Sequence, residues 1–558
     1  MSQTIEKKQK KQFMSGAKAI IECMKIEEVT KVFCVPGESY LPVLDAIYDE
    51  PTIELISARH EGGASFMAEG YAKATGKPGV VMATRGVGGA NLAIGVHTAF
   101  QDSTPMVVFL GQVHSKFRGR EGFQEVDLDQ FFGHIAKWTV EIKDAERVPE
   151  FVQRAFRIAQ TGRPGPVVLS LPEDMLKLEC EMLFGPKVSI PRPSPSSQEI
   201  LQIENILSQA KNPLIIAGGG VIHSEGEQEL IEFAEKYHLP VMAAFRRHDV
   251  FPNNHPLYVG HLGLGTAKGI IETVKEADCV LAIGTRLSEV TTQDYTLLSP
   301  EQKLIHIDIH AEMLGNVYPP EVGIVADARK TLLACLNVNI VPTWKEWADK
   351  CHRTYEQAST LTKTNQKEKL TNFDVIDLLQ NLLPENTILT NDAGNFAGWL
   401  HSYFQFHTKR TYVGPTSGAM GYGLPAAIGV KLAHPDRVVV SLSGDGGMMM
   451  TVQELETASR YNIPVISIVF NNQMYGTIRM HQEMHYPNKI SGTDLGNIDF
   501  ISLAHSLNAN GVKANTRVEF AIALKEAMKS NKPTVIEIEM DQEQISTSKT
   551  IQQIREQS

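Results

Sequence analysis

The sequence has few cysteines and no long apolar run. Its six cysteines are scattered and form no C-x-x-C pair, so neither a disulfide framework nor a zinc site is indicated. No apolar stretch approaches the roughly 18 residues that a membrane-spanning helix needs. No stretch of the signal-peptide type follows the polar N-terminus either, because Lys18, Glu22 and Lys25 interrupt it. We therefore expect a cytoplasmic protein without a membrane partner.

Positive charge is also scarce. Lys and Arg number 53 against 64 Asp and Glu, which gives a formal net charge of −11. This balance argues against a nucleic-acid or anionic-membrane partner, because phosphate binding requires a basic face. The 558 residues, of which 42% are apolar and 21% charged, are typical of a globular protein with about three or four domains.

Three α/β domains are predicted along the chain, over residues 12–185, 199–345 and 373–545. A Pro- and Ser-rich linker separates the first two, and a polar connector separates the last two. Short continuous apolar runs such as PMVVFLG (105–111) and NIPVISIVFNN (462–472) are typical of strands buried on both faces. Since such runs alternate with helical patterns, the fold class is α/β, with three doubly wound parallel-sheet domains.

The glycine-rich turns of the second domain give only weak support for a nicotinamide-type dinucleotide site. GGGVIHS (218–224) and GLGTAKG (263–269) both differ from G-x-G-x-x-G, and no acidic residue follows at the usual spacing. Hydride transfer remains an alternative. The simpler interpretation is that small residues let a helix start pack close to a strand.

The strongest functional signal is an aspartate between glycines at the end of the run VVVSLSGDGG (438–447). The next apolar run ends in Asn471 and Asn472. Because parallel strands end at the same edge of a sheet, Asp445 and Asn472 are expected to lie at neighbouring strand ends. Their carboxylate and amide oxygens suit Mg²⁺, and Gly444, Gly446 and Gly447 leave room for backbone amides to meet a phosphate.

This pattern resembles the thiamine diphosphate signature, here GDG, 24 residues and NN. The resemblance extends over nearly the whole chain and is greatest to the acetolactate-synthase-like branch. Three further segments carry it: RHEGGASFMAEGYAKATG (59–76), TRGVGGANLAIGVHTAFQDSTPMVVFLGQV (84–113) and SGAMGYGLPAAIG (417–429). It implies a pyrimidine-binding first domain, a central Rossmann-like domain and a third domain that binds diphosphate and magnesium.

The resemblance also implies roles for individual residues. Asp445, Asn472 and the Met474 carbonyl would bind Mg²⁺, and Met420 would support the bent cofactor. Gly418 would accept a hydrogen bond from its 4′-amino group. Further cofactor-binding candidates are Gly37, Asn395, Phe396, Gly444, Gly446 and Gly447.

Glu61 is the candidate catalytic acid. A carboxyl group bonded to N1′ of the pyrimidine favours the imino tautomer, whose 4′ nitrogen can take the proton from C2 of the thiazolium. The cofactor then carries the carbanion chemistry. In this family Glu61 and the metal site meet across a subunit interface, so the resemblance implies at least a dimer and favours a tetramer.

The fate of the decarboxylated 2-oxo acid decides the function. Simple decarboxylases of the superfamily carry a His-His pair in the first domain, whereas the matching loop here has only His114. FQE (123–125) and AKW (136–138) match synthase segments, which makes Gln124 and Lys137 candidate catalytic residues. Arg479 follows N-N and is interpreted as a cation for the carboxylate of an acceptor. These features favour joining the product to a second 2-oxo acid, as in acetolactate synthesis.

Two departures from the branch leave alternatives open. His481 stands where the branch has a tryptophan that selects acceptors, and the glycine loop of the central domain differs. FAD, another nucleotide or no ligand therefore remain alternatives for that domain. A non-oxidative 2-oxo acid decarboxylase, an acyl-transferring relative and a non-catalytic cofactor-binding protein remain alternative functions.

Overall fold

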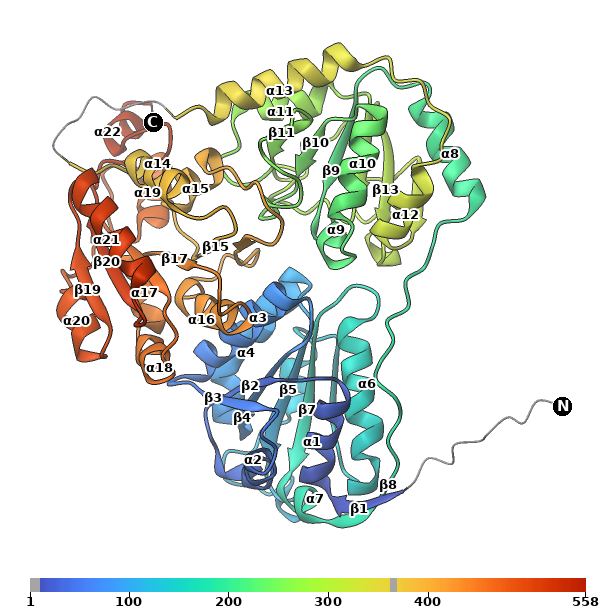
Figure 1. Cartoon of the computed structure of the whole chain (residues 1–558), viewed down its shortest axis with the longest axis vertical. Coiled ribbons are helices and arrows are strands. Elements are labelled where there is room, and N and C mark those ends of the chain that lie inside the picture. Colours follow the sequence, from blue (N-terminus) through green and yellow to red (C-terminus); the bar gives the residue numbers. More distant parts are fainter. Residues whose placement is uncertain (1–10, 362–368, 558) are drawn as a thin grey trace. The chain divides into compact units, whose positions relative to one another are not determined.

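The computed structural model describes residues 11–361 and 369–557. Within these ranges the chain forms three six-stranded parallel sheets, which confirms the predicted fold class (Figure 1). It divides into two compact units, one containing the first sheet and the other containing the second and third. None of the helices in the described ranges is both long and apolar enough to cross a membrane.

The first sheet has the strand order β3-β2-β4-β5-β7-β6. Strands β5 and β7 are buried along their whole length, because helices cover both faces. Helices α3 and α4 pack against each other and against β4 and β5. The strands are β2 (Lys31–Cys34), β3 (Glu54–Ser57), β4 (Gly79–Thr84), β5 (Met106–Gln112), β6 (Trp138–Glu141) and β7 (Pro166–Pro172), with a separate antiparallel pair β1 (Gln12–Ser15) and β8 (Glu179–Met182). The helices are α1 (Gly16–Ile26), α2 (Leu41–Tyr48), α3 (Glu61–Thr75), α4 (Arg85–Asp102), α5 (Leu128–Phe132), α6 (Val148–Gln160) and α7 (Glu173–Lys177).

The central sheet has a different order, β11-β10-β9-β12-β13-β14. Counted along the domain this is 3-2-1-4-5-6, the order of many dinucleotide-binding folds. The strands are β9 (Pro213–Ala217), β10 (Val241–Ala243), β11 (Tyr258–His261), β12 (Cys279–Ile283), β13 (Lys303–Asp308) and β14 (Val322–Val325). The helices are α8 (Ser197–Leu207), α9 (Gly219–His223), α10 (Glu227–Tyr237), α11 (Lys268–Glu276), α12 (Ala328–Cys335) and α13 (Lys345–Ser359).

The third sheet repeats the topology of the first. Its order β16-β15-β17-β18-β20-β19 corresponds to 2-1-3-4-6-5 along the domain, as in the first sheet. The strands are β15 (Ile388–Asn391), β16 (Tyr412–Val413), β17 (Val439–Gly444), β18 (Ile466–Asn471), β19 (Asn510–Lys513) and β20 (Thr534–Glu539). The helices are α14 (Asn372–Leu382), α15 (Ala397–Tyr403), α16 (Gly423–Ala433), α17 (Asp445–Thr451), α18 (Glu454–Arg460), α19 (Gly476–His485), α20 (Phe500–Ser506), α21 (Arg517–Lys529) and α22 (Ile551–Arg555).

The predicted domain ranges contain all strands of the three sheets. Helix α22 lies beyond residue 545, where the third predicted domain ends. The repeated topology of the first and third domains has no counterpart in a sequence repeat. In both sheets the first strand of the domain lies between the second and the third, so the chain winds outwards in opposite directions on its two sides. Such a switch point is where ligands bind in doubly wound folds.

Candidate functional site

Glu61 is the first residue of α3, four residues beyond Ser57 at the carboxyl end of β3. The imidazole Nδ1 of His60 accepts a hydrogen bond from the Gly62 amide at 3.0 Å and so caps the helix. Glu61 is buried, and its Oε2 accepts a hydrogen bond from Nδ2 of Asn91 on α4 at 3.0 Å. The carboxyl group is thus fixed at the ligand-binding edge of the first sheet.

Gly37 lies at the switch point of the same sheet, just after β2. A Cβ on Gly37 would lie 2.5 Å from the Cβ of Thr84, so only glycine allows the loops after β2 and β4 to approach this closely. The hydroxyl oxygens of Ser39 and Thr84 are 2.7 Å apart and join the two loops. Gly37 therefore shapes the edge at which Glu61 lies.

Gln124 also belongs to this edge. It has a left-handed backbone, with φ +63°, and its carbonyl accepts a hydrogen bond from the Gly86 amide at 3.1 Å. Gly86 is in the first turn of α4, directly after β4. The structure therefore places Gln124 over the carboxyl end of the sheet.

Lys137 lies at the amino-terminal ends of the strands, opposite to the end at which Glu61 lies. It precedes β6, and its backbone amide bonds to Pro166 at the start of the parallel strand β7. Its ammonium donates to the carbonyls of Ile158 at 2.5 Å and Thr161 at 2.8 Å, at the C-terminal end of α6. Burial, with the nearby Arg163 cation, lowers the pKa of Lys137 to about 8. The structure does not bring Lys137 together with Glu61 and gives it a helix-capping contact instead.

Asp445 follows β17 on one side of the switch point of the third sheet, and it begins α17. It is only 4% exposed. Burial raises its pKa to about 6, although nearby backbone amides, including those of Gly446 and Asn472, partly oppose this effect. A buried carboxylate whose charged form is disfavoured in this way is suited to a cation.

The loop after β18 carries the other predicted metal ligands. The Asn472 side-chain oxygen accepts a hydrogen bond from the Met474 amide at 3.3 Å, and Gln473 between them has φ +54°. Met474 is buried and forms an isolated antiparallel bridge with Asp494. One carboxylate, one amide oxygen and one backbone carbonyl are hard donors that fit Mg²⁺. Accordingly, the described part of the chain contains no group of three His, Cys, Asp or Glu side chains that could hold a metal ion by themselves.

Asp392, on the other side of the switch point, was missed by the sequence reasoning. It directly follows β15 and is fully buried, and burial raises its pKa to about 6. Its carboxylate accepts a hydrogen bond from the Gly423 amide, whereas Oδ2 has no hydrogen-bond partner among the described residues. A Cβ on Gly447 would lie 2.3 Å from this Oδ2, so Gly447 must be small. The sequence signal that could have identified Asp392 is the one that identified Asp445, a polar residue directly after a buried strand.

The remaining cofactor candidates differ in what they offer. The Asn395 amide donates to the Ile545 carbonyl at 2.7 Å, and its Oδ1 accepts from the Thr477 hydroxyl at 2.8 Å. The Phe396 ring stacks on Phe470, with centroids 5.1 Å apart. Their side chains are therefore engaged within the domain, which leaves their backbone amides as donors for a diphosphate.

Gly418 and Met420 lie in the loop before α16. Gly418 is exposed with φ +69°, and Met420 is half-buried two residues later. A positive φ at Gly418 turns the loop sharply, a conformation that glycine adopts at no steric cost. The loop geometry is compatible with the predicted cofactor-supporting role.

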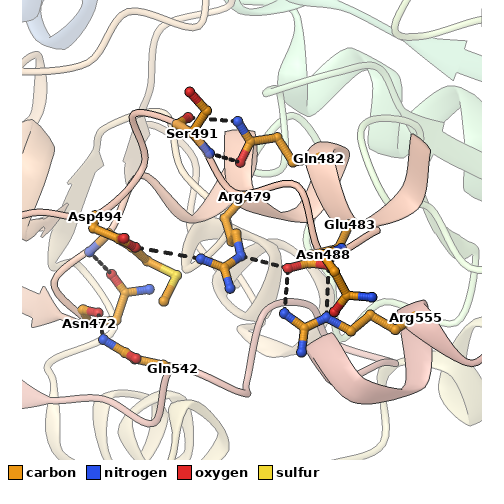
Figure 2. A network of polar contacts seen from close by, with 10 residues as sticks. Asn472, Arg479, Gln482, Glu483, Asn488, Ser491, Asp494, Gln542 and Arg555 are labelled. Carbon is orange, nitrogen blue, oxygen red and sulfur yellow. Dashed lines mark hydrogen bonds and ion pairs between the residues drawn. The ribbon is translucent and has the colours of Figure 1, made fainter. Parts of the chain in front are cut away.

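Arg479 is engaged by acidic side chains of its own domain (Figure 2). It is buried, its Nε donates to Glu483 at 2.9 Å, and its Nη1 lies 3.5 Å from Asp494. This arrangement does not support the interpretation of Arg479 as a cation for an acceptor carboxylate. His481, on the same helix, stacks on His485 with centroids 6.2 Å apart.

The central domain has the strand order of a dinucleotide fold, but its glycine turn is already in use. The Gly218 amide donates to the Ile283 carbonyl at 2.9 Å, and the Gly220 amide donates to the Gly284 carbonyl at 2.8 Å. A Cβ on Gly220 would lie 2.6 Å from the Cα of Gly284. These glycines therefore serve contact between two loops, and their amides are not presented to a diphosphate.

Known proteins match this chain in all three domains. Three models of thiamine pyrophosphate enzymes match the chain: the N-terminal TPP binding domain at 14–131, the central domain at 200–335 and the C-terminal TPP binding domain at 392–538. The probable acetolactate synthase large subunit of Methanocaldococcus jannaschii is 36% identical over 95% of this chain and 92% of its own length. The acetolactate synthase large subunit of Haemophilus influenzae is 33% identical over 95% of each chain.

A third relative, the acetolactate synthase isozyme 3 large subunit of Escherichia coli, is 31% identical over 95% of each chain. Matches of this extent cover all three domains, including Glu61 in the first and Asp445 and Asn472 in the third. The chain therefore belongs to the thiamine pyrophosphate enzyme family and is an enzyme of its acetolactate synthase large subunit branch.

Proposed function

We propose that the chain is a magnesium- and thiamine diphosphate-dependent acetolactate synthase. It decarboxylates a 2-oxo acid such as pyruvate and joins the remaining acyl unit to a second 2-oxo acid. The single observation that carries this proposal is the meeting of Asp445 and the Asn472 loop at the carboxyl ends of neighbouring strands. The names of the relatives support the choice of reaction.

The metal and diphosphate would be held by the third domain. Asp445, the Asn472 side-chain oxygen and the Met474 carbonyl supply the metal ligands, and the helix start at Asp445 favours negative charge. The backbone groups that meet the diphosphate belong to residues whose side chains are small or engaged elsewhere: Asn395, Phe396, Gly444, Gly446 and Gly447.

The pyrimidine end would be held across a subunit interface, by Glu61 and Gly37 of one subunit and by the Gly418–Met420 loop of another. When bound, thiamine diphosphate supplies a carbon nucleophile for the 2-oxo acid carbonyl and delocalises the charge left by CO₂ loss. Glu61 would hold a proton at N1′ of the pyrimidine, and the Asn91 amide keeps the carboxyl group oriented. The Gly418 carbonyl would accept a hydrogen bond from the 4′-amino group, and Met420 would support the bound cofactor.

Acceptor binding is assigned to the first domain rather than to Arg479. Gln124 lies at the same edge of the sheet as Glu61 and is our candidate for a contact with the second 2-oxo acid. We assign Lys137 no role in this mechanism, because its ammonium donates to the carbonyls of Ile158 and Thr161 at the opposite end of the strands. We further propose at least a dimer, and by preference a tetramer, in the cytoplasm, with small 2-oxo acids as the other partners.

The experiment is to incubate the purified chain with pyruvate, Mg²⁺ and thiamine diphosphate and to identify the products. Acetolactate with release of one CO₂ per pyruvate pair consumed supports the synthase. Acetaldehyde without acetolactate would assign a decarboxylase, and no CO₂ release would assign a binding protein.

A further inference from the structure

The C-terminal segment contacts the loop that carries the predicted magnesium ligands. Gln542 Nε2 donates to the carbonyl of Asn472 at 3.0 Å, and the Met540 amide donates to the carbonyl of Asn471 at 2.9 Å. The Ile545 carbonyl accepts from Asn395 at 2.7 Å. The chain thus returns from β20 directly onto the residues that are expected to hold the metal and the diphosphate.

A small apolar cluster continues this contact. Met474, Ile545, Ile551 and Ile554 are each at most 6% exposed and pack together, with Met480 of α19 against them. Ile551 and Ile554 lie on α22. The Met474 side chain is therefore buried under the C-terminal helix, whereas its carbonyl is the predicted metal ligand.

An ion-pair network holds α22 on α19 (Figure 2). Arg555 donates to both carboxylate oxygens of Glu483, from Nε at 2.8 Å and from Nη2 at 2.7 Å. Glu483 is fully buried and also accepts from the Asn488 amide at 3.0 Å and from Arg479 Nε at 2.9 Å. These donors lower the pKa of Glu483 to about 2, with Arg555 the largest contributor. A two-point arginine contact of this kind is directional as well as strong.

Arg479 links the network to the metal loop. Its Nη1 lies 3.5 Å from Asp494, and Asp494 is bridged to the backbone of Met474. A continuous chain of contacts therefore runs from Arg555 through Glu483, Arg479 and Asp494 to Met474.

We propose that Glu483 and Arg555 are positioning residues for the magnesium loop, and that α22 is a latch that fixes the Asn472 and Met474 oxygens for the metal. This inference rests on the proposed function for the identity of the metal. The latch itself is a property of the chain alone. Partners that orient metal ligands typically change metal affinity by about 10–100-fold when they are removed.

The first test does not involve the cofactor. Amide hydrogen exchange of the segment 471–495 is measured in the cofactor-free full chain of wild type, Glu483→Gln and Arg555→Gln. We expect faster exchange of this segment in both variants. Unchanged exchange in both would overturn the latch, whatever the chain binds.

The second test measures the Mg²⁺ concentration that half-saturates thiamine diphosphate binding, by calorimetry. Both single variants are expected to require about tenfold more Mg²⁺. The double variant should be no worse than either single variant, and Arg555→Lys should recover part of the loss. Equal Mg²⁺ dependence of wild type and variants would overturn the proposal, whereas failure of the wild type to bind would overturn the proposed function instead.

Arg517 provides a matched control. It contacts Asp374 at 2.5 Å and also Asp377, and so joins α21 to α14 of the same domain, and neither helix is part of segment 471–495. Arg517→Gln should lower stability while leaving the Mg²⁺ dependence unchanged. If Arg517→Gln shifted the Mg²⁺ dependence as much as Arg555→Gln does, general destabilisation would explain the effect and the latch would be rejected.

Discussion

The side-chain amide of Asn91 donates a hydrogen bond of 3.0 Å to the carboxyl group of Glu61, from one helix of the first domain to the start of another. A neutral donor orients the carboxyl group without pairing its charge. The other oxygen, Oε1, lies beside Gly88 and is the atom that we expect to contact a ring nitrogen of a bound ligand. This relationship allows the role of Glu61 to be tested apart from folding.

Glu61→Gln is expected to slow C2 proton exchange of bound thiamine diphosphate by at least about a hundredfold, because an acid–base group typically contributes that much. Cofactor binding should stay measurable, since glutamine preserves the volume and can still accept from Asn91. Exchange takes place in deuterated solvent, is then quenched, and is measured by NMR as loss of the C2 proton signal. Asn91→Ala should slow exchange by a smaller factor, and unchanged exchange in Glu61→Gln would remove Glu61 from its role.

Asp445→Ala is expected to weaken Mg²⁺-dependent cofactor binding by more than about tenfold, since even residues that only support metal ligands have effects of that size. The loss should be specific to the metal-dependent part of the binding. Calorimetric titration with and without Mg²⁺ separates the two parts. Equal affinity of wild type and variant in the presence of Mg²⁺ would refute the metal assignment.

Lys137→Met is expected to lower stability by about 1–3 kcal/mol, because the carbonyls of Ile158 and Thr161 lose their donor. Product formation by the folded variant should stay near the wild-type rate. Gln124→Asn is the contrasting variant, in which we expect product formation to fall. Asparagine tolerates the positive φ of this position, but its shorter side chain should no longer reach the second 2-oxo acid. A Lys137→Met variant that folds normally and is inactive would restore Lys137 as a catalytic residue.

Asp392 should give the cofactor-free chain a distinct pH dependence. The pKa of Asp392 is raised to about 6 in the folded protein, against an ordinary value of about 4, so the folded state binds more protons between these values. Stability should therefore fall as pH rises from about 4 to about 6. Thermal unfolding midpoints across this range should show a smaller fall for Asp392→Asn than for wild type, and identical pH profiles would contradict the assignment.

The purified chain is expected to lack flavin absorption. The amides of Gly218 and Gly220 are already bonded to the loop after β12, so the central domain has fewer free donors for a nucleotide diphosphate. An absorption spectrum of the protein purified in the presence of FAD decides the point. A stoichiometric flavin spectrum would show that other groups of the central domain hold the cofactor.

The neighbouring positions of Asp445 and Asn472 could be predicted because parallel strands end at one edge of a sheet. Asp445 and Asn472 each follow a continuous apolar run, and the structure places those runs as the neighbouring strands β17 and β18. The same rule would have found Asp392 after β15. It was missed because a single aspartate after a strand is also typical of a helix cap.

The contacts of Lys137 and Arg479 could not be predicted, because they join residues distant in the sequence. The segment AKW resembles synthase segments, but that resemblance does not show that Lys137 lies at the amino end of β6, under the carbonyls of α6. Arg479 is near the N-N motif, yet its partner Glu483 is shared with Arg555, 76 positions further along than Arg479. Such pairings follow from tertiary packing and have no local signal.

A crystal structure of the chain with thiamine diphosphate and Mg²⁺ tests the central claim most directly. We predict a metal ion bound by Asp445, Asn472 and the Met474 carbonyl, with Glu61 of the partner subunit within hydrogen-bond distance of the pyrimidine ring. A cofactor bound elsewhere, or a pyrimidine that Glu61 does not reach, would contradict the account.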